Sequence, residues 1–332
     1  MYASALSALD FSAKSHYEVA SDTPQFVVLS FDGSKSSTML KETLEFQNKL
    51  KAENKPLSFT YFINAAYFLT KETSSVYQGP GQKPGVSNIG YSHTTTDIAK
   101  RVETFNTALA QGNEIASHSV GHFNGIHWSY EDWKKEFTSF NTVMSMIPQI
   151  NPTLPPETHL NITPSQIKGF RAPELGVNRE LYKVLKEFNY SYDASGVGIK
   201  ENWPKKDSQG IWHIPLGTIY IGSQQSAAIA MDYSLWMHQS KAKETAKKGT
   251  AEWQHDYDET LSGFMSYFKG NYKGGRAPVV IANHFSKWND GVYWEAMKTF
   301  AENVCGQPHV ECVTFKELVN YLDTTGVPPI AN

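Results

Sequence analysis

Two histidines four residues apart are the feature of this chain that most suggests chemistry. His118 and His122 follow the short strand-like run at 114–117, and only small residues separate them. If the chain turns into a helix there, both imidazoles lie on one face, with Cβ atoms about 5–6 Å apart, close enough to share a metal ion. The alternative is a chance pair on a surface helix, in a chain with 11 histidines.

Other polar side chains stand at or just beyond the ends of predicted strands, where barrel enzymes collect their catalytic groups. They are Asp32, Arg171, Asp193 and His284. Side chains of these types bind metal or transfer protons. So many such side chains at strand ends are difficult to explain as ordinary residues of solvated loops. Each also has an ordinary interpretation. Asp32 could cap the next helix, Arg171 and Asp193 could form an ion pair, and His284 could be a core histidine, as we expect of His213.

Apolar β-prone runs alternate with amphipathic segments along the chain, a pattern typical of a parallel α/β sheet or barrel. We predict strands at 26–31, 59–63, 114–117, 169–173, 190–193, 211–214, 217–221, 278–282 and 310–313, and helices over 36–52, 95–111, 129–146, 178–188, 251–268, after residue 290 and up to residue 322. The expected division is an N-terminal arm (1–23), one domain (24–323) and a tail (324–332). We expect the long loop at 71–93 to cover a site, and that loop and segment 223–250 to shape a sugar groove.

Composition limits the possible functions. The 332 residues are 40% hydrophobic and carry a net charge of −3, which fits a soluble α/β protein and gives no attraction to nucleic acid or anionic membranes. No stretch approaches the roughly 20 apolar residues of a membrane span. The 8 Trp and 17 Tyr suit stacking against sugars, although most should pack in the core. Cys305 and Cys312 could remain thiols, but we favour a disulfide.

Five short motifs occur along residues 24–323: Ser30-Phe31-Asp32, His118-Ser119-Val120-Gly121-His122, Arg171-Ala172-Pro173, Asp193-Ala194-Ser195 and Ala282-Asn283-His284. In order and spacing they resemble the motifs of the NodB-like polysaccharide deacetylases, carbohydrate esterase family 4. The resemblance implies a distorted (β/α) barrel, a divalent metal that is usually zinc, and hydrolysis of N-acetyl groups from polymers that contain N-acetylglucosamine. The second and third motifs are its most specific part.

The resemblance also implies how the residues share the work of amide hydrolysis. His118 and His122 would hold the metal, which polarises the acetyl carbonyl and activates a bound water. Asp32 would take the proton of that water, and Arg171 would keep Asp32 ionised.

The leaving amine needs a proton as well. His284 would supply it, and Asp193 would fix the tautomer of this histidine. The backbone N–H of Glu174, directly after Pro173, would help the metal to stabilise the oxyanion.

The first motif departs from the family pattern, which has two adjacent aspartates, a base and then a metal ligand. Here Asp32 is followed by Gly33, which has no side chain to bind metal. Either the base survives and the ligand is lost, or Asp32 is the ligand and the base is missing. Two histidines leave zinc short of the usual three protein ligands. Glu174, His127, Asp32 or a bound water or anion could complete the shell.

Three functions therefore remain in view. The first is metal-dependent N-deacetylation of a chitin-like or peptidoglycan-like glycan, and the others are a catalytically silent carbohydrate-binding protein and an amidase with a small non-sugar substrate. The polar N-terminus shows no signal peptide, as in a mature exported chain or a cytoplasmic one. Because its expected substrate lies outside the cell, we expect the protein to be secreted or periplasmic.

Overall fold

A mixed sheet forms the centre of the computed structural model, which describes residues 23–199, 201–223 and 225–328. Its strands are β1 (Gln25–Asp32), β2 (Phe59–Ile63), β3 (Glu114–Ser117), β4 (Gly169–Phe170), β5 (Tyr192–Asp193), β7 (Lys205–Lys206), β8 (Trp212–His213), β11 (Val279–His284) and β12 (Val310–Cys312). They lie in the order β11-β1-β2-β3-β4-β5-β8-β7, and β12 also pairs with β1. All pairs are parallel except that of β7 with β8. The predicted arm lies outside the described residues, apart from residue 23.

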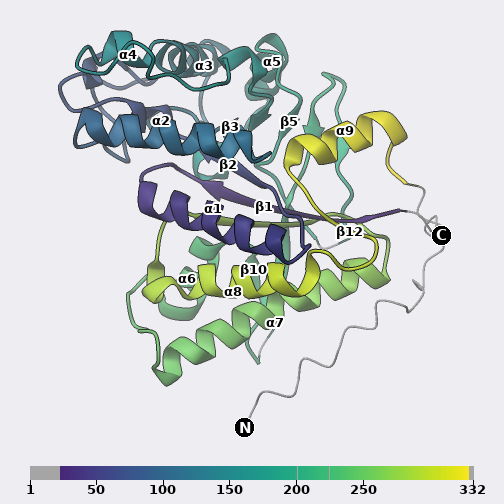
Figure 1. The fold of residues 1–332 in the computed structure, drawn as a ribbon. Coiled ribbons are helices and arrows are strands. Elements are labelled where there is room, and N and C mark those ends of the chain that lie inside the picture. The colour runs from purple at the N-terminus through teal and green to yellow at the C-terminus, as the bar shows by residue number, and fades with distance from the viewer. Residues whose placement is uncertain (1–22, 200, 224, 329–332) are drawn as a thin grey trace.

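Helices cover the sheet, as the alternating pattern predicts. They are α1 (Ser37–Ala52), α2 (Thr95–Ala110), α3 (Tyr130–Ser145), α4 (Ile147–Ile150), α5 (Arg179–Glu187), α6 (Asp232–Ser240), α7 (Ala251–Lys273), α8 (Trp288–Val304) and α9 (Phe315–Thr325). In Figure 1, α7 and α8 run side by side below β1, and α2 and α3 lie above it. The last helix continues two residues beyond the predicted domain end at 323. Within the described part of the chain, no helix is both long and apolar enough to cross a membrane.

The two faces of the sheet pack into two separate clusters of buried side chains. One cluster lies between the sheet and helices such as α1, α2 and α8, and the other faces inward, where α9 packs. In β1, Phe26 and Val28 belong to the inner cluster, and Leu29 and Phe31 to the outer one. Because side chains alternate along a strand, Asp32 at the end of β1 faces inward.

A second sheet is formed by β6 (Val197–Gly198), β9 (Leu216–Ile221) and β10 (Ser226–Ile229), in the order β10-β9-β6. The chain after β10 runs beside β11, where Met231 and Ala282 form a parallel bridge. The sequence analysis assigns no helix or strand to segment 223–250, whereas the structure places β10 and α6 within it. The hydrophobic pattern of α6 is weak because Asp232 and Leu235 are its buried residues.

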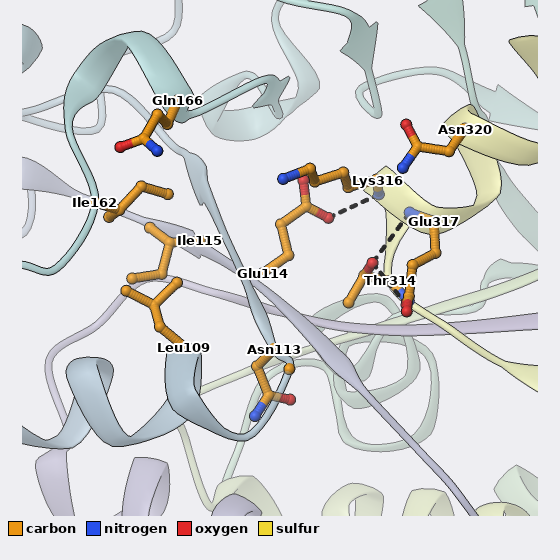
Figure 2. Close-up of a pocket in the computed structure, with 11 residues that line it drawn as sticks. Leu109, Asn113, Glu114, Ile115, Ile162, Gln166, Thr314, Lys316, Glu317 and Asn320 are labelled. Atoms are coloured by element: carbon orange, nitrogen blue, oxygen red, sulfur yellow. Dashed lines mark hydrogen bonds between the residues drawn. The ribbon is translucent and has the colours of Figure 1, made fainter.

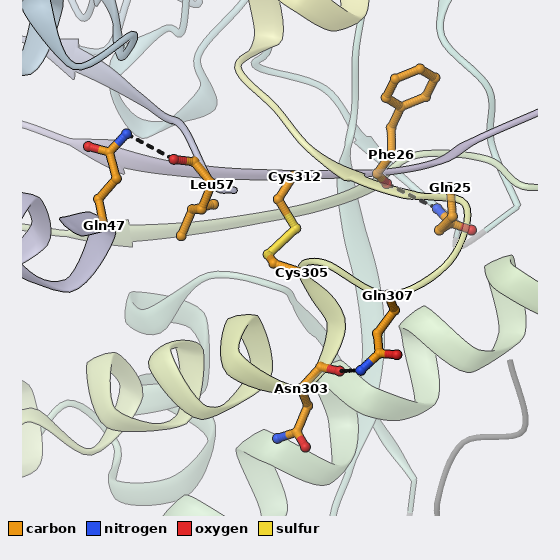
Figure 3. The surroundings of a disulfide bond; sticks show 8 residues. All are labelled: Gln25, Phe26, Gln47, Leu57, Asn303, Cys305, Gln307 and Cys312. Carbon is orange, nitrogen blue, oxygen red and sulfur yellow. Dashed lines mark hydrogen bonds between the residues drawn. A yellow bond between two sulfur atoms is a disulfide. The ribbon is translucent and has the colours of Figure 1, made fainter. Parts of the chain in front are cut away.

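A disulfide links the end of α8 to β12. Figure 3 shows the bond between Cys305 and Cys312, which confirms the predicted pairing. The bond lies close to Leu57, whose carbonyl oxygen accepts a hydrogen bond of 2.8 Å from the side chain of Gln47 in α1. It thus secures β12 near the start of β2, on the side of the molecule where the parallel strands begin.

Candidate active site

Asp32 and His284 lie side by side at the ends of two neighbouring strands. Asp32 is the last residue of β1 and His284 the last of β11, and their Cα atoms are partners in the register of the two strands. Asp32 is 3% exposed, and each side chain affects the pKa of the other. The carboxylate and the imidazole therefore share one space at the carboxyl edge of the sheet.

A buried arginine holds Asp32 in its ionised form. The Nη1 of Arg171 lies 2.6 Å from Asp32 Oδ1 and 3.0 Å from Ser30 Oγ, and its Nε donates to the carbonyl oxygen of Ala194 at 3.0 Å. The guanidinium also lies 4.1 Å from the centre of the Phe62 ring. Burial by itself raises the pKa of Asp32, but the nearby positive charge, with Arg171 foremost, outweighs burial and lowers that pKa. Asp32 is thus a carboxylate ready to accept a proton.

His284 is oriented by a residue that the sequence analysis assigned no role. Asp232, at the start of α6, places Oδ1 2.7 Å from His284 Nδ1, and its Oδ2 accepts the backbone N–H of His284 at 2.7 Å. Burial alone would lower the pKa of His284, but the Asp232 carboxylate raises it above its usual value. The imidazole is therefore held in one orientation and favours its protonated form.

Asp193 does not take this role, and the prediction that it fixes the His284 tautomer was wrong. Tyr192, the residue before it, belongs to the inner cluster, so the alternation of β5 turns Asp193 to the other face. There its Oδ1 accepts the backbone N–H of Ser195 at 3.1 Å, and its Oδ2 lies 3.5 Å from His213 Nδ1. Asp193 supports the chain that follows β5 instead of the reacting groups.

His213 also differs from expectation. Its side chain is 30% exposed and its Nε2 lies 3.0 Å from Asp207 Oδ2, so it is not a core histidine. It is the register partner of Asp193 in neighbouring strands, so the two side chains lie on the same face of the sheet. Contact with the two carboxylates raises the pKa of His213.

His118 and His122 do come together, but not on a helix. The chain after β3 forms a loop in which Ser119 and His122 have left-handed backbone conformations, with φ of 62° and 58°. The two imidazole rings are 5.0 Å apart between centroids and inclined by 75°. The two imidazoles are therefore close together although the chain forms no helix there, because a tight turn can bring residues four apart as close as a helix does.

Neighbouring loops fix the positions of the two histidines. The Asn64 side chain, directly after β2, donates to the carbonyl oxygen of His118. The Asn88 side chain donates to the carbonyl oxygen of His122 at 3.0 Å. Asn88 belongs to the long loop at 71–93, so that loop contacts the segment that carries the two histidines.

The residues between the histidines are held as firmly. The backbone N–H of Val120 donates to Glu136 Oε1 at 2.8 Å, and Glu136 Oε2 accepts from the Tyr77 hydroxyl at 2.8 Å. Gly121 has no room for a side chain, because a Cβ atom there would lie 2.6 Å from the Tyr77 ring. The loop is thus a rigid element, as a site with positioned ligands requires.

The tautomer of His118 suits a metal ligand. Its Nδ1 lies 2.7 Å from the carbonyl oxygen of Arg171, and a carbonyl oxygen can only accept, so Nδ1 carries the proton and Nε2 keeps its lone pair. Burial lowers the pKa of His118 to about 3, and burial likewise lowers that of His122. Both imidazoles are therefore neutral at ordinary pH, as metal binding requires.

Among the described residues, no third side chain joins His118 and His122 to complete a set of metal ligands. In the same described part of the chain, no group of three or more His, Cys, Asp or Glu side chains is arranged to hold a metal ion. Asp32 is engaged by Arg171, whereas Glu174 and His127 are exposed, and the Glu174 carboxylate accepts from the Asn124 side chain at 3.1 Å. The donor set thus supplies two of the three protein ligands usual for catalytic zinc.

Gly33 stands where the missing carboxylate would be expected. Its φ is +86°, and a Cβ atom added there would meet one neighbour, Asn64 Oδ1, at 3.9 Å. Space for a side chain is therefore present, although the backbone conformation favours glycine. The backbone N–H of Glu174 remains the predicted oxyanion donor; this residue is left-handed (φ 53°) within the short helix η4 (Pro173–Leu175).

A pocket at the opposite end of β3 is separate from these residues. Figure 2 shows this cavity of about 230 Å³ between the end of α2, the start of β3 and α9. The buried Glu114 in it accepts hydrogen bonds of 2.9 Å from the Thr60 hydroxyl, the Tyr192 hydroxyl and the backbone N–H of Lys316. Burial raises the pKa of Glu114 to about 7. Because β3 begins here and His118 follows its other end, we assign this pocket to stability.

No family model and no curated protein sequence matches the chain. The crystal structure of a "putative polysaccharide deacetylase" from Mycobacterium smegmatis aligns with 96% of this chain and 98% of its own, with a TM-score of 0.55 and 14% identity. The chain has the polysaccharide-deacetylase fold. The predicted distorted (β/α) barrel is thereby confirmed, and at this identity the likeness concerns the fold alone.

Two further structures show weaker likeness to this deacetylase fold. The carbohydrate esterase family 4 domain of a multidomain xylanase, from the hindgut metagenome of Trinervitermes trinervoides, is 14% identical and covers 91% of this chain and 92% of its own, with a TM-score of 0.46. A pseudoenzyme of the same family from Bacillus anthracis is 11% identical and covers 90% of this chain and 66% of its own, with a TM-score of 0.45. Neither TM-score reaches 0.5, so neither likeness supports an argument about this site.

Asp232 is the main site residue that the sequence analysis missed. It lies beside the end of β11 because the chain after β10 pairs with that strand, where the backbone N–H of Ala282 donates to the carbonyl oxygen of Ala230 at 2.9 Å. The segment that pairs with β11 in this way contains no apolar run long enough to predict a strand there. The available signal was an aspartate directly after the small apolar stretch at 227–231, in a chain whose other strands end in polar side chains.

Proposed function

We propose that this protein hydrolyses acetamide groups on amino sugars in a polymer that contains N-acetylglucosamine. The observation that supports this best is the pairing of Asp32 with His284 at the ends of adjacent strands, each oriented by a buried partner of opposite charge. Arg171 favours the ionised form of Asp32, and Asp232 favours the protonated form of His284. A base and an acid thus face one space, as amide hydrolysis requires.

The two groups have complementary tasks. Asp32 accepts a proton from the attacking water as its oxygen bonds to the acetyl carbon. When the carbon–nitrogen bond breaks, His284 gives its Nε2 proton to the leaving amine, while Asp232 stabilises the charged imidazole through Nδ1. Acetate and a free amino sugar are the products. The backbone N–H of Glu174 is our candidate donor to the oxyanion.

We further propose that His118 and His122 bind a divalent cation such as zinc, weakly. The neutral imidazoles and the free Nε2 of His118 favour binding, and the missing third ligand limits its strength. Metal content after dialysis against zinc, and its loss in a His118→Ala, His122→Ala double variant, test this directly. Wild-type protein that retains no more zinc than the double variant would contradict it.

Acetate release tests the activity. Purified protein is incubated with N-acetylglucosamine oligomers and with peptidoglycan fragments, with and without added divalent metal. We expect release of acetate, and a loss of about 10²–10⁴-fold in Asp32→Asn and His284→Asn. Absence of acetate under all conditions, or release that these substitutions do not change, would overturn the proposal.

A binding protein without activity is the second candidate, and Gly33 favours it. Because Gly33 has no side chain, the pair His118 and His122 has no third ligand within the part of the chain that the structure describes. In that case the wild-type chain binds the same oligomers and releases no acetate. The Asp32→Asn variant then binds these oligomers as tightly as the wild type does. Isothermal titration of wild type and variant with one oligomer separates the two candidates.

A further inference from the structure

Three aromatic side chains gather beside His284. We call Tyr233, Trp236 and Trp288 the aromatic wall. The two indoles stack, with centroids 4.8 Å apart and an inclination of 10°, and the Tyr233 ring lies 5.5 Å from Trp288 at 62° and 6.1 Å from Trp236 at 68°. Tyr233 is 46% exposed and both indoles are half-buried, so the wall presents ring surface to solvent.

The wall is continuous with the candidate active site. The Trp288 ring lies 5.3 Å from the His284 ring, and the Tyr233 ring lies 6.4 Å from it. Tyr233 also directly follows Asp232, which orients His284. A molecule bound to the aromatic wall therefore lies next to His284, the proposed proton donor.

The backbone that carries Trp288 is held in a costly conformation. The next two residues, Asn289 and Asp290, are left-handed with φ of 47° and 53°, a conformation that residues with a side chain adopt uncommonly. Hydrogen bonds from the loop between α6 and α7 fix this turn. The backbone N–H of Asn289 donates to Glu244 Oε2 at 2.7 Å, and Asn289 Oδ1 accepts the Thr245 N–H at 3.0 Å. Such strain persists where a precise placement is needed, as in a binding site.

Other contacts fix the second indole. The Nε1 of Trp236 donates to the carbonyl oxygen of Lys243 at 3.0 Å, so its polar edge is satisfied while one of its faces stacks on Trp288. Rigid aromatic rings with little conformational entropy to lose make effective binding surfaces. The wall therefore has the character of a platform for a flat, partly apolar ring.

We propose that the aromatic wall binds the pyranose ring next to the sugar that carries the reacting acetamide, so that the ligand is an oligosaccharide and not a monosaccharide. The position of the reacting sugar in this inference rests on the proposed function. The occupant follows from the contact with His284, because a glycan chain that places one sugar at the acid must pass its neighbour over an adjoining surface.

Binding along a series of oligomers tests the inference. The dissociation constants of N-acetylglucosamine and its oligomers, up to the hexasaccharide, are measured by isothermal titration for wild type, Tyr233→Ala, Tyr233→Phe and Trp236→Ala. Tyr220→Ala is the matched control, since Tyr220 is 52% exposed on β9. We expect the hexasaccharide to bind about tenfold more weakly to Tyr233→Ala and Trp236→Ala, and unchanged to Tyr233→Phe and Tyr220→Ala. Monosaccharide binding should be the same throughout.

The outcomes separate this inference from the proposed function. If no acetate is released but the two alanine variants lose oligomer affinity, the activity fails and the aromatic subsite stands. If acetate is released and the two variants bind every oligomer like Tyr220→Ala, the activity stands and the subsite is overturned. Self-association of the wild type, abolished in Tyr233→Ala with oligomer binding unchanged, would assign the wall to a second copy of the chain and would also overturn the inference.

Discussion

One carboxylate, that of Asp232, holds both the ring and the backbone of His284. Its Oδ1 lies 2.7 Å from His284 Nδ1 and its Oδ2 accepts the His284 backbone N–H at 2.7 Å, so the imidazole cannot turn without breaking a contact. Asp232→Asn removes the charge that raises the pKa of His284. We therefore expect kcat to fall about 10²-fold or more, and the basic limb of the pH–rate profile to move to lower pH.

Asp193→Asn is the control for this change, because the family resemblance gave Asp193 the role that Asp232 occupies. Asp193 is as buried as Asp232, but it contacts Ser195 and His213. We expect Asp193→Asn to leave the basic limb in place. A shift of that limb in Asp193→Asn, with none in Asp232→Asn, would refute the assignment made from the structure.

Replacing Arg171 should affect the opposite limb. Lysine keeps the charge of Arg171 but cannot reach Asp32, Ser30 and the Ala194 carbonyl together. With less stabilisation of its charged form, the pKa of Asp32 rises, so more of this base is protonated at acidic pH. We expect the acidic limb of kcat/KM in Arg171→Lys to move to higher pH and the plateau to fall by about tenfold or more. An acidic limb at its wild-type position would show that another group is the base.

Gly33→Asp should trade stability for metal affinity. The open space at Gly33 admits a carboxylate, while its φ of +86° makes a side chain cost about 1–2 kcal/mol. Gly210→Asp is a matched control, since Gly210 has a φ of +87° and no atom within 4 Å of an added Cβ. We expect both variants to lose similar stability in urea, and only Gly33→Asp to bind zinc more tightly, by at least about tenfold. Equal zinc affinities would place Gly33 outside the metal shell.

Glu114 makes stability depend on pH. Burial raises its pKa from 4.5 to about 7, so the folded protein holds this proton more tightly than the unfolded chain does. The free energy of unfolding should therefore fall as pH rises between those values, by up to about 3 kcal/mol, and stay level above them. Urea unfolding at about pH 5 and about pH 8 measures this, and Glu114→Gln should remove most of the difference. An unchanged difference in the variant would assign it to other groups.

The sequence predicts where strands end far better than which way their last side chains face. Apolar runs marked β1, β3 and β11 clearly, so Asp32, His118 and His284 were expected at one edge and lie there. The orientation of Asp193 depends on β5, a two-residue strand whose alternation is set by tertiary packing. Local patterns do not contain that information.

Contacts between distant segments explain the other differences. Asp232 reaches His284 because the chain after β10 joins the edge of β11, a pairing across some 50 residues that no local pattern predicts. The spacing of His118 and His122 fits a helix and a left-handed turn equally well. The turn forms because Asn64 and Glu136, both distant in sequence, satisfy its backbone groups.

The alternation of side chains along β1 restricts how this protein can evolve. Ser30 and Asp32 meet Arg171 because they are two residues apart on the same face. Deleting one residue from β1 before Asp32 would turn the Asp32 carboxylate toward the helices on the other face of the sheet. Point substitutions can thus adjust the chemistry gradually, whereas a codon deleted from β1 would abolish it in one step. Length variation should accumulate instead in the connecting loops.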